Sequence, residues 1–583
     1  MFFYDVAVPE MALSNLIYQC PVEIKTGLRV IVEVRKHFHA GFVLGETKNS
    51  LPSDVKIKNI EAVIDKFPVI SPDLWDMALY AGRVCLCGAA AALKVILPRY
   101  FIMGDKIENP PKNFDFDSGK FREKNFFTPF DSERFDFYLS ELNPGERTLI
   151  LFSQKDKAKK FFESLSDEMK NRALLWISTA GKKYLSSWFQ IQEGKFDFVI
   201  GTAGAVFAPL MPQKIIIEDE ASQNFFIPPV LNISARSLAG HRAAFLGAEF
   251  ISGGRLPSLK TFIRTKPEEK ILPKRKNIIF ADIFHYQTLN GEQKGIKGSI
   301  PLTSSLLKKT YRELIKKNNV IWILDRLGEA SEVFCSRCGE TVKCPKCKNS
   351  MRAENDGRTL RCGICGTVCD LPPKCGKCGF EVLTGRRPGL EALEKIAKKY
   401  YDKVVIYKDK YSVIKKNNLI ISTRRGLELC EKIHPSLIAW LDLDLELSHH
   451  GYNTQLEVFT MLWDSYWRGR EKDSERKVLI QSRSAGMKLA KFFPKGWTKF
   501  FSQELAERMD FNLPPFGFIV ELETQNTELR EKILDSFFDA GIFVMDSGEN
   551  EPLYINLKSL EPVWKILNSM KISARELKIT VQN

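Results

Sequence analysis

The chain has 583 residues, of which 44% are hydrophobic and 11% aromatic. It is too long for a single hydrophobic core and too rich in apolar residues for a disordered protein, so we expect several globular domains. Lys and Arg number 86 against 71 Asp and Glu, a formal net charge of +15. This excess favours polyanionic partners, nucleic acid first, because cations that bind a phosphate backbone release its counterions.

The first five residues, Met1 to Asp5, lack the basic segment and apolar stretch of a secretory signal. The most apolar segment, Cys85 to Leu97, is interrupted by Lys94 and is shorter than the roughly 20 residues that cross a bilayer. We therefore expect a cytoplasmic protein without a membrane partner. A reducing compartment disfavours disulfides, so clustered cysteines there indicate metal binding.

The segment 1–103 contains short alternating runs, such as Leu28–Val34 and Gly41–Leu44. Such runs, separated by polar turns, predict a β-rich N-terminal domain. Residues 104–130 have no clear periodicity, and we predict a linker there.

From residue 131 on, continuous apolar runs alternate with helical stretches, as at Thr148–Phe152 and again at Leu437–Leu441. Continuous apolar strands separated by helices imply parallel sheets that are covered on both faces. The pattern predicts a multidomain α/β protein with the following parts: a first lobe at 131–272, a second lobe at 273–334 and 379–507, an insertion at 335–378, and a small α+β domain at 508–583.

The insertion contains nine of the 13 cysteines, and eight of them form four Cys-x-x-Cys arms. One arm on a tight turn presents two thiolates to one cation, and two arms complete a tetrahedral shell of four thiolates that suits Zn(II). Four arms therefore predict two zinc ions. The arms are Cys335/Cys338, Cys344/Cys347, Cys362/Cys365 and Cys375/Cys378.

The sequence alone allows three pairings of the four arms. An iron–sulfur cluster is the minor alternative to zinc, because such clusters also use shells of four cysteines. Eight ligands fill both shells and leave no open position for a reacting water, so we expect a structural module. The ninth cysteine, Cys369, is then a bystander.

Several motifs accompany the cysteine arms, which end in Cys375-Gly-Lys-Cys-Gly379. They include Val199-Ile-Gly-Thr202, Ala235–Ala243, Leu441-Asp-Leu-Asp444 and Leu513-Pro-Pro-Phe516. Over nearly its whole length the chain resembles the PriA family, the bacterial replication-restart helicases also named primosomal protein N-prime.

The resemblance implies two RecA-like helicase lobes, an N-terminal domain that binds DNA at the fork and a C-terminal domain that also contacts DNA. It also implies a nested zinc pairing. The outer arms, Cys335/Cys338 and Cys375/Cys378, would share one ion, and the inner arms, Cys344/Cys347 and Cys362/Cys365, the other.

The motor chemistry of such a helicase is degraded in this chain. The pattern that cradles ATP phosphates, Gly-x4-Gly-Lys-Ser/Thr, occurs nowhere. At its place stand Asp131-Ser-Glu-Arg-Phe135, with Phe135 where a hydroxyl would bind magnesium. The family's Asp-Glu-Glu-His run provides a magnesium ligand and a water-polarising carboxylate, of which Asp219 and Glu220 are vestigial candidates. Binding of ATP and Mg²⁺ is therefore not expected.

Two further motifs depart from the family. The third helicase motif is replaced by Gly253–Pro257, which has no small hydroxyl residues. The last motif keeps Arg468 and Arg470 without its glutamine, and these arginines beside Trp467 either contact a nucleic-acid backbone or cover the surface.

The pocket for a 3′ DNA end is also reduced in the N-terminal domain. Tyr18 remains as a base-stacking candidate and Lys58 as a phosphate partner, and the alternative for Tyr18 is a tyrosine of the core or surface. The family's winged-helix domain has no counterpart in the short linker.

These observations favour a bacterial, nucleoid-associated PriA-like protein that binds single-stranded or branched DNA and recruits primosome partners without a working motor. Two alternatives remain. One is a divergent but active 3′–5′ helicase, and the other is a zinc-stabilised protein interaction module that no longer binds DNA. The oligomeric state is not predicted.

Overall fold

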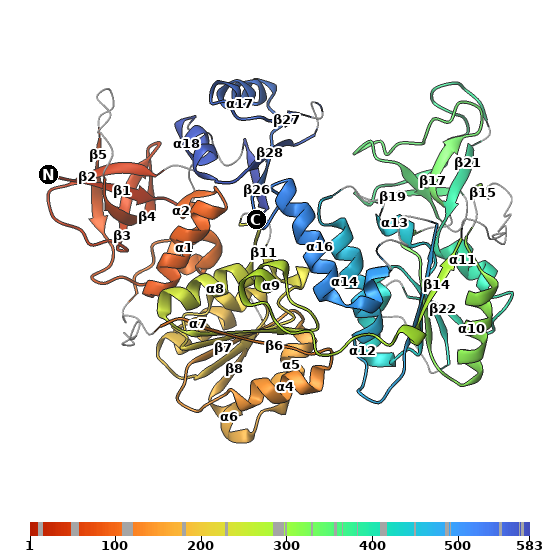
Figure 1. The fold of residues 1–583 in the computed structure, drawn as a ribbon. Coiled ribbons are helices and arrows are strands. Elements are labelled where there is room, and N and C mark those ends of the chain that lie inside the picture. Colours follow the sequence, from red (N-terminus) through yellow and green to blue (C-terminus); the bar gives the residue numbers. More distant parts are fainter. Residues whose placement is uncertain are drawn as a thin grey trace. The chain divides into compact units, whose positions relative to one another are not determined.

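The fold is that of a computed structural model of the chain (Figure 1). It divides into two compact units: Met1–Thr128 with Ser132–Glu268 and Leu505–Asn583, and Pro129–Asp131 with Glu269–Glu504. The structure describes all residues except 10–14, 48–56, 108–119, 178–181, 228–230, 284–295, 298–299, 328–329, 355–357, 364, 382, 408–416, 448–450, 484–488, 490, 547, 549–550, 571, 573–575 and 583.

The N-terminal domain is a closed five-stranded barrel, as its alternating sequence predicts. Its strands, in the order β1-β2-β5-β3-β4, are β1 (Phe2–Ala7), β2 (Leu16–Cys20), β3 (Arg29–Val34), β4 (His37–Glu46) and β5 (Lys58–Val63). Arg35 and Lys36 connect β3 to β4 with φ of 48° and 66°, which is the backbone of a tight two-residue hairpin. Alternate residues such as Val30 and Val32 fill the interior.

The end of the segment 1–103 is helical, in contrast to the β-rich structure predicted for it. Helix α1 (Pro72–Val84) and helix α2 (Gly88–Ile96) share one hydrophobic core with the first lobe. Arg242 of α8 (Ala235–Leu246) fixes this contact, since its Nε lies 2.6 Å from Asp73 Oδ2 and both side chains are fully buried. Several alanines and the periodic burial of α1 explain why the helix prevails over strand.

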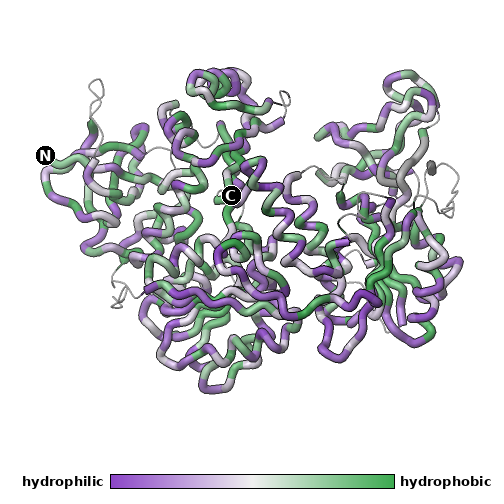
Figure 2. Tube along the Cα trace, viewed as in Figure 1, coloured by the Kyte–Doolittle hydropathy of each residue, from purple (hydrophilic) through white to green (hydrophobic). Residues whose placement is uncertain are grey.

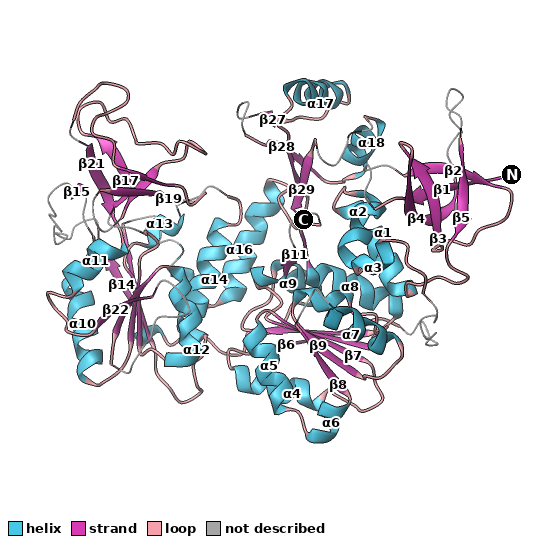
Figure 3. Ribbon diagram, turned by 180° about the vertical axis from the view of Figure 1, so that it is seen from behind, coloured by secondary structure: helices cyan, strands magenta, loops and turns pink. Residues whose placement is uncertain are grey.

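The first lobe is a six-stranded parallel sheet in the order β6-β13-β10-β7-β9-β8. Helices α7 (Lys182–Gln192) and α8 lie on one side of the sheet, and α4 (Asp131–Ser140) and α5 (Lys155–Ser164) on the other (Figure 3). The strands are β6 (Arg122–Phe127), β7 (Thr148–Phe152), β8 (Ala173–Trp176), β9 (Phe198–Gly201), β10 (Lys214–Glu218) and β13 (Glu249–Gly254).

Strand β6 corrects the linker predicted at 104–130. It pairs with β13 along its whole length, from Arg122 opposite Glu249 to Phe127 opposite Gly254. Only a parallel neighbour far along the chain satisfies its backbone, so local periodicity gave no signal. Residues 108–119 of the predicted linker lie outside the described residues.

The second lobe is a six-stranded parallel sheet in the order β14-β25-β24-β16-β23-β22. Its strands are almost entirely apolar, and Figure 2 shows them as a green bundle. They are β14 (Ile278–Asp282), β16 (Val320–Ile323), β22 (Val404–Tyr407), β23 (Leu419–Ser422), β24 (Leu437–Trp440) and β25 (Lys477–Ser482).

The cysteine-rich insertion has its own sheet in the order β15-β21-β17-β18-β19-β20. The strands are β15 (Ile296–Lys297), β17 (Ala330–Cys335), β18 (Met351–Ala353), β19 (Thr359–Cys362), β20 (Val368–Asp370) and β21 (Leu383–Pro388). Strands β17 to β21 lie between β16 and β22 in the chain, so the insertion interrupts the second lobe, while β15 precedes β16.

The C-terminal domain is an antiparallel sheet in the order β27-β28-β26-β29 with two helices. Its elements are β26 (Phe518–Glu523), α17 (Thr527–Asp539), β27 (Met545–Asp546), β28 (Leu553–Leu557), α18 (Glu561–Ser569) and β29 (Lys578–Gln582). The predicted fold class, with two α/β lobes, a cysteine-rich insertion, a β-rich N-terminal domain and an α+β C-terminal domain, is confirmed. Among the described residues, no helix is both long and apolar enough to span a membrane.

Candidate functional site

The cysteine arms form two groups of four thiols, and within each group the sulfur atoms lie within 4.8 Å of one another. In the outer group the sulfurs of Cys335 and Cys378 are 3.6 Å apart, and those of Cys338 and Cys375 are 3.7 Å apart. These separations match the edge of about 3.8 Å expected for a tetrahedron of sulfurs around zinc at about 2.3 Å.

The inner group has the same geometry and completes the nested order that the family resemblance implies. The sulfurs of Cys344 and Cys365 are 3.6 Å apart, and those of Cys347 and Cys362 are 3.4 Å apart. Cys369 belongs to neither group and lies on β20 opposite Leu360. Both donor sets consist of four thiols, which fits Zn(II) or another thiophilic ion.

One backbone feature repeats in all four arms and explains why their spacing positions the sulfurs. The residue after the second cysteine adopts a left-handed conformation, with φ of 75°, 61°, 72° and 70° in chain order. Its N–H donates to the carbonyl of the first cysteine over 2.9–3.2 Å. The four residues are Gly339, Lys348, Gly366 and Gly379, three of them the residue type that this conformation favours.

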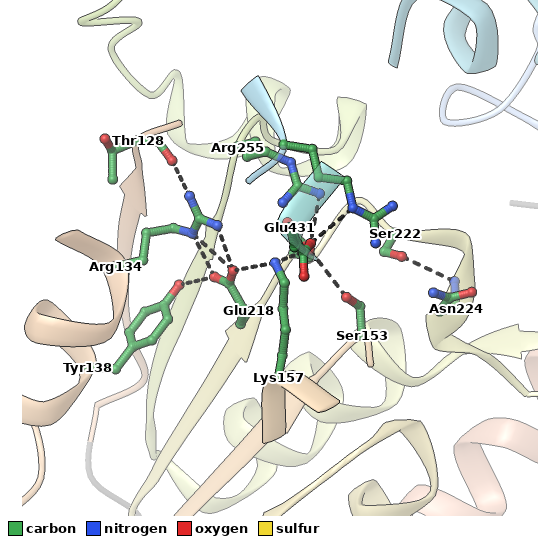
Figure 4. Close-up of polar contacts among 12 residues, drawn as sticks. Thr128, Arg134, Tyr138, Ser153, Lys157, Glu218, Ser222, Asn224, Arg255 and Glu431 are labelled. Atoms are coloured by element: carbon green, nitrogen blue, oxygen red, sulfur yellow. Dashed lines mark hydrogen bonds and ion pairs between the residues drawn. The ribbon is translucent and has the colours of Figure 1, made fainter. Parts of the chain in front are cut away.

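The second candidate site lies in the first lobe, where the family binds nucleotide. Helix α4 follows β6 after a short loop, and Arg134 in its first turn is fully buried. Its guanidinium forms a two-pronged contact with Glu218 at the end of β10: Nε lies 2.9 Å from Oε2 and Nη2 lies 2.8 Å from Oε1 (Figure 4). Arg134 also donates to the Thr128 carbonyl.

Glu218 has two further partners. The Tyr138 hydroxyl donates to its Oε2 over 2.8 Å, and Lys157 Nζ lies 3.7 Å from Oε1 (Figure 4). Burial raises the pKa of Tyr138 well above its usual value, and the nearby Glu218 charge adds to this effect. The hydroxyl therefore stays protonated and acts as a donor.

The carboxylates of Asp219 and Glu220, the vestigial candidates from the sequence, are also paired with basic side chains of the first lobe. Asp219 Oδ2 lies 3.2 Å from each of Ser153 Oγ, Lys157 Nζ and Arg255 Nη2. Asp219 and Glu220 are 6% and 2% exposed.

Glu220 Oε1 accepts the backbone N–H of Ser258 over 2.6 Å, and Glu220 forms an ion pair with Arg236. Each of the three successive carboxylates is thus paired with a cation from the first lobe. The paired carboxylates are Glu218, Asp219 and Glu220.

Glu218 is a residue of this buried cluster that the sequence reasoning missed. From the sequence, Asp219 is the residue matched to the family's first carboxylate. In the structure Glu218 is the last residue of strand β10, and it forms an ion pair with Arg134, which lies in the segment that replaces the phosphate loop. Arg134 was the available signal, because a buried cation there requires an acidic partner.

The predicted DNA contacts of the barrel are register partners on strands β2 and β5, and both contact Glu33. Tyr18 is 4% exposed within the barrel core, and its hydroxyl donates to the Glu33 carbonyl over 3.1 Å. Burial raises its pKa to about 12. Lys58 is exposed and forms an ion pair with Glu33 at 3.0 Å. Base stacking by Tyr18 and phosphate binding by Lys58 stay predictions.

The two arginines of the last motif are largely buried in the second lobe. Arg468 Nε lies 2.9 Å from Glu431 Oε1, and the Arg470 guanidinium lies 4.7 Å from the centre of the Tyr466 ring. They are 7% and 8% exposed. Their contact with a nucleic-acid backbone also stays a prediction.

Comparison with known proteins assigns the chain to a family. Residues 5–98 match the model of the 3′DNA-binding domain of PriA. The chain is 24% identical over 374 residues to the replication restart protein PriA of Haemophilus influenzae, covering 60% of this chain and 51% of that protein. It is 24% identical over 561 residues to PriA of Rickettsia typhi, covering 88% and 85%. The domain match and these relatives, which extend across much of the chain, support a PriA-family member.

The chain spans about half the length of several of these PriA relatives, including that of Thermotoga maritima, of which it covers 50% at 23% identity. Among solved structures it is similar to RecG bound to a three-way DNA junction, with a TM-score of 0.34, 10% identity, and coverage of 66% of this chain and 43% of RecG. A likeness at that level supports no inference about the site.

Proposed function

We propose that this PriA-family protein binds branched or single-stranded DNA in replication restart and works as an assembly platform without an ATP-driven motor. The buried Arg134–Glu218 pair is the main observation that supports the proposed lack of ATP-driven activity. Arg134 lies in the segment that replaces the phosphate loop and is paired with Glu218, and Asp219, the residue matched to the magnesium ligand, is held by Lys157 and Arg255.

The energy of that pair decides whether nucleotide could displace it. Both side chains have no exposed surface, and breaking a buried ion pair costs about 3–5 kcal/mol. A ligand with a Kd of 1 mM gains only about 4 kcal/mol on binding. Breaking the Arg134–Glu218 pair would thus offset most of the binding free energy of ATP at such a Kd. The contacts of Lys157 and Arg255 with Asp219 would still remain to be broken.

DNA binding is supported by the matched 3′DNA-binding domain and by the net charge of +15. The two groups of four thiols would form a rigid scaffold when metal is bound, and we assign zinc to both from their donor set. Primosome proteins are the proposed partners, since the family members it resembles are replication restart proteins.

The test is a calorimetric titration of the metal-replete full chain with ATP and Mg²⁺, with and without a forked DNA, together with an assay of phosphate release. We expect no binding up to millimolar ATP and no DNA-stimulated hydrolysis. Hydrolysis that forked DNA stimulates and that Glu220→Gln abolishes would overturn the proposal and favour the active helicase. Glu268→Gln, at an exposed carboxylate, is the matched control.

Fork binding at increasing salt separates the platform from a zinc-stabilised module that no longer binds DNA. The platform predicts that log K falls linearly with log salt, because phosphate contacts release counterions. An association that salt leaves unchanged, or no association at low salt, would favour the interaction module.

A further inference from the structure

Both helices described in the C-terminal domain, α17 and α18, pack on one face of its sheet. Val520 and Leu522 of β26 and Ile555 of β28 pack against α17 and α18 in a continuous core. Side chains alternate along a strand, so the residues between them point to the opposite face. On that face Met545, Tyr554, Glu521 and Thr580 stand side by side across the four strands.

An apolar edge borders this face. Phe543 is 83% exposed and Met545 is 52% exposed. Ile542 and Val544, their chain neighbours, pack on the core, so Phe543 and Met545 project away from it together. Phe511, 69% exposed, is connected to the neighbouring strand β28, because its carbonyl accepts from Asn556 Nδ2 over 3.0 Å.

The charge of this face is negative. Glu521 and Glu523 share one cation, Lys578, which lies 2.6 Å from Glu523, and Gln582 Nε2 donates to Glu521. Burial still raises the pKa of Glu521 although Lys578 and Gln582 lower it, so a further cation beside Glu521 would stabilise its charged form. Residues 518–583 contain 7 Lys or Arg against 11 Asp or Glu, a net charge of −4 within a chain of net charge +15.

We propose that this face binds a cationic protein segment that also carries apolar side chains. The apolar residues of the partner would cover Phe543, Met545 and Tyr554, and its Lys or Arg would pair with Glu521. Exposed aromatic residues on a sheet also suit nucleic-acid bases. Here the phosphates would meet Glu521 and Glu523 with no free cation on the described part of the face, so charge favours protein.

This inference goes beyond the proposed function and does not depend on the first lobe or on ATP. It differs from the DNA contact that the family resemblance implies for this domain. The two can fail separately, because fork binding and nucleotide binding are measured on the unaltered chain while the face is tested by substitutions within residues 518–583.

The test is selection of random 12-residue peptides, displayed on phage, by the immobilised metal-replete chain. We expect the selected peptides to be enriched in Lys or Arg together with Leu, Ile or Phe. Synthetic copies should bind at least tenfold more weakly to Phe543→Ser and to Glu521→Lys, and their affinity should fall with added salt. Phe538→Ser is the matched control, because Phe538 is 82% exposed at the end of α17, in the helical layer.

Selection of acidic peptides, or peptide binding that Phe543→Ser and Glu521→Lys leave unchanged, would overturn the inference. So would a single-stranded oligonucleotide that competes with the peptides and whose affinity falls in Phe543→Ser but not in Phe538→Ser. Both substituted residues are at least partly exposed, and circular dichroism of each variant verifies that it is folded.

Discussion

At the scale of single residues, the Arg134–Glu218 pair determines what the first lobe can do. We expect Arg134→Met to lower the free energy of unfolding of this lobe by about 3–5 kcal/mol, because it leaves Glu218 buried without its main partner. The double variant Arg134→Met, Glu218→Met should lose less than the sum of the two single variants, since neither charge is left behind. Hydrogen exchange of the β10 amides measures the effect, and additive losses would contradict the pairing.

A second prediction at this scale concerns Glu446 of α13 (Leu443–Leu447) in the second lobe. Burial, aided by Asp325, raises its pKa to about 7 from an ordinary value of 4.5. The folded state therefore holds this proton more tightly than the unfolded state, and the contribution of Glu446 to stability falls as pH rises from about 4.5 through 7.

Glu446→Gln should consequently stabilise the chain at pH 8, by up to about 3 kcal/mol, and have little effect at pH 4.5. Denaturant midpoints of both proteins at the two pH values measure this. Glu428→Gln, at an exposed position of the same lobe, serves as the control. Equal effects of Glu446→Gln at both pH values would show that Glu446 does not titrate in this range.

At the scale of elements, the cysteine arms act in pairs that are not adjacent in the chain. We expect two zinc ions per chain by mass spectrometry of the native protein. Cys335→Ser with Cys338→Ser should remove one ion, and adding Cys375→Ser with Cys378→Ser should remove no other, because these four share one site. Adding Cys344→Ser with Cys347→Ser instead should remove the second. Loss of both ions from the first double variant would contradict the nested grouping.

The contact of strand β13 with helix α4 leads to another prediction. A Cβ at Gly253 would lie 1.8 Å from the Tyr138 hydroxyl oxygen, so Gly253→Ala must displace the ring that donates to Glu218. The expected cost is about 1–3 kcal/mol. Gly240→Ala in α8 meets only Phe250 at 3.8 Å and should be neutral or stabilising. Thermal melting of both variants makes the comparison, and equal melting temperatures would exclude the clash.

At the scale of the whole molecule, the proposal separates DNA binding from nucleotide. At constant free Mg²⁺, the slope of log K for forked DNA against log salt should be the same with and without 1 mM ATP, because no conformational change is linked to a ligand that does not bind. Fluorescence anisotropy of a labelled fork measures the slope. A slope that changes with ATP would show that nucleotide still reaches the protein.

Much of this molecule follows from sequence alone, for a local reason. Each Cys-x-x-Cys arm closes through a hydrogen bond between residues four apart, so its geometry depends only on neighbouring residues and can be predicted from the local sequence. The parallel lobes are likewise predictable, because strands buried on both faces are continuously apolar. The resemblance to the PriA family follows from motifs such as Leu441–Asp444, and the comparisons support it.

Other features depend on residues that only the tertiary structure brings together. Arg134 and Glu218 are 84 positions apart, and they meet only where strand β10 ends. The burial of Tyr18 depends likewise on closure of the barrel. The sequence determined that the phosphate loop is missing. Only the tertiary structure decided what took its place, because a buried charge selects its partner by distance in space rather than along the chain.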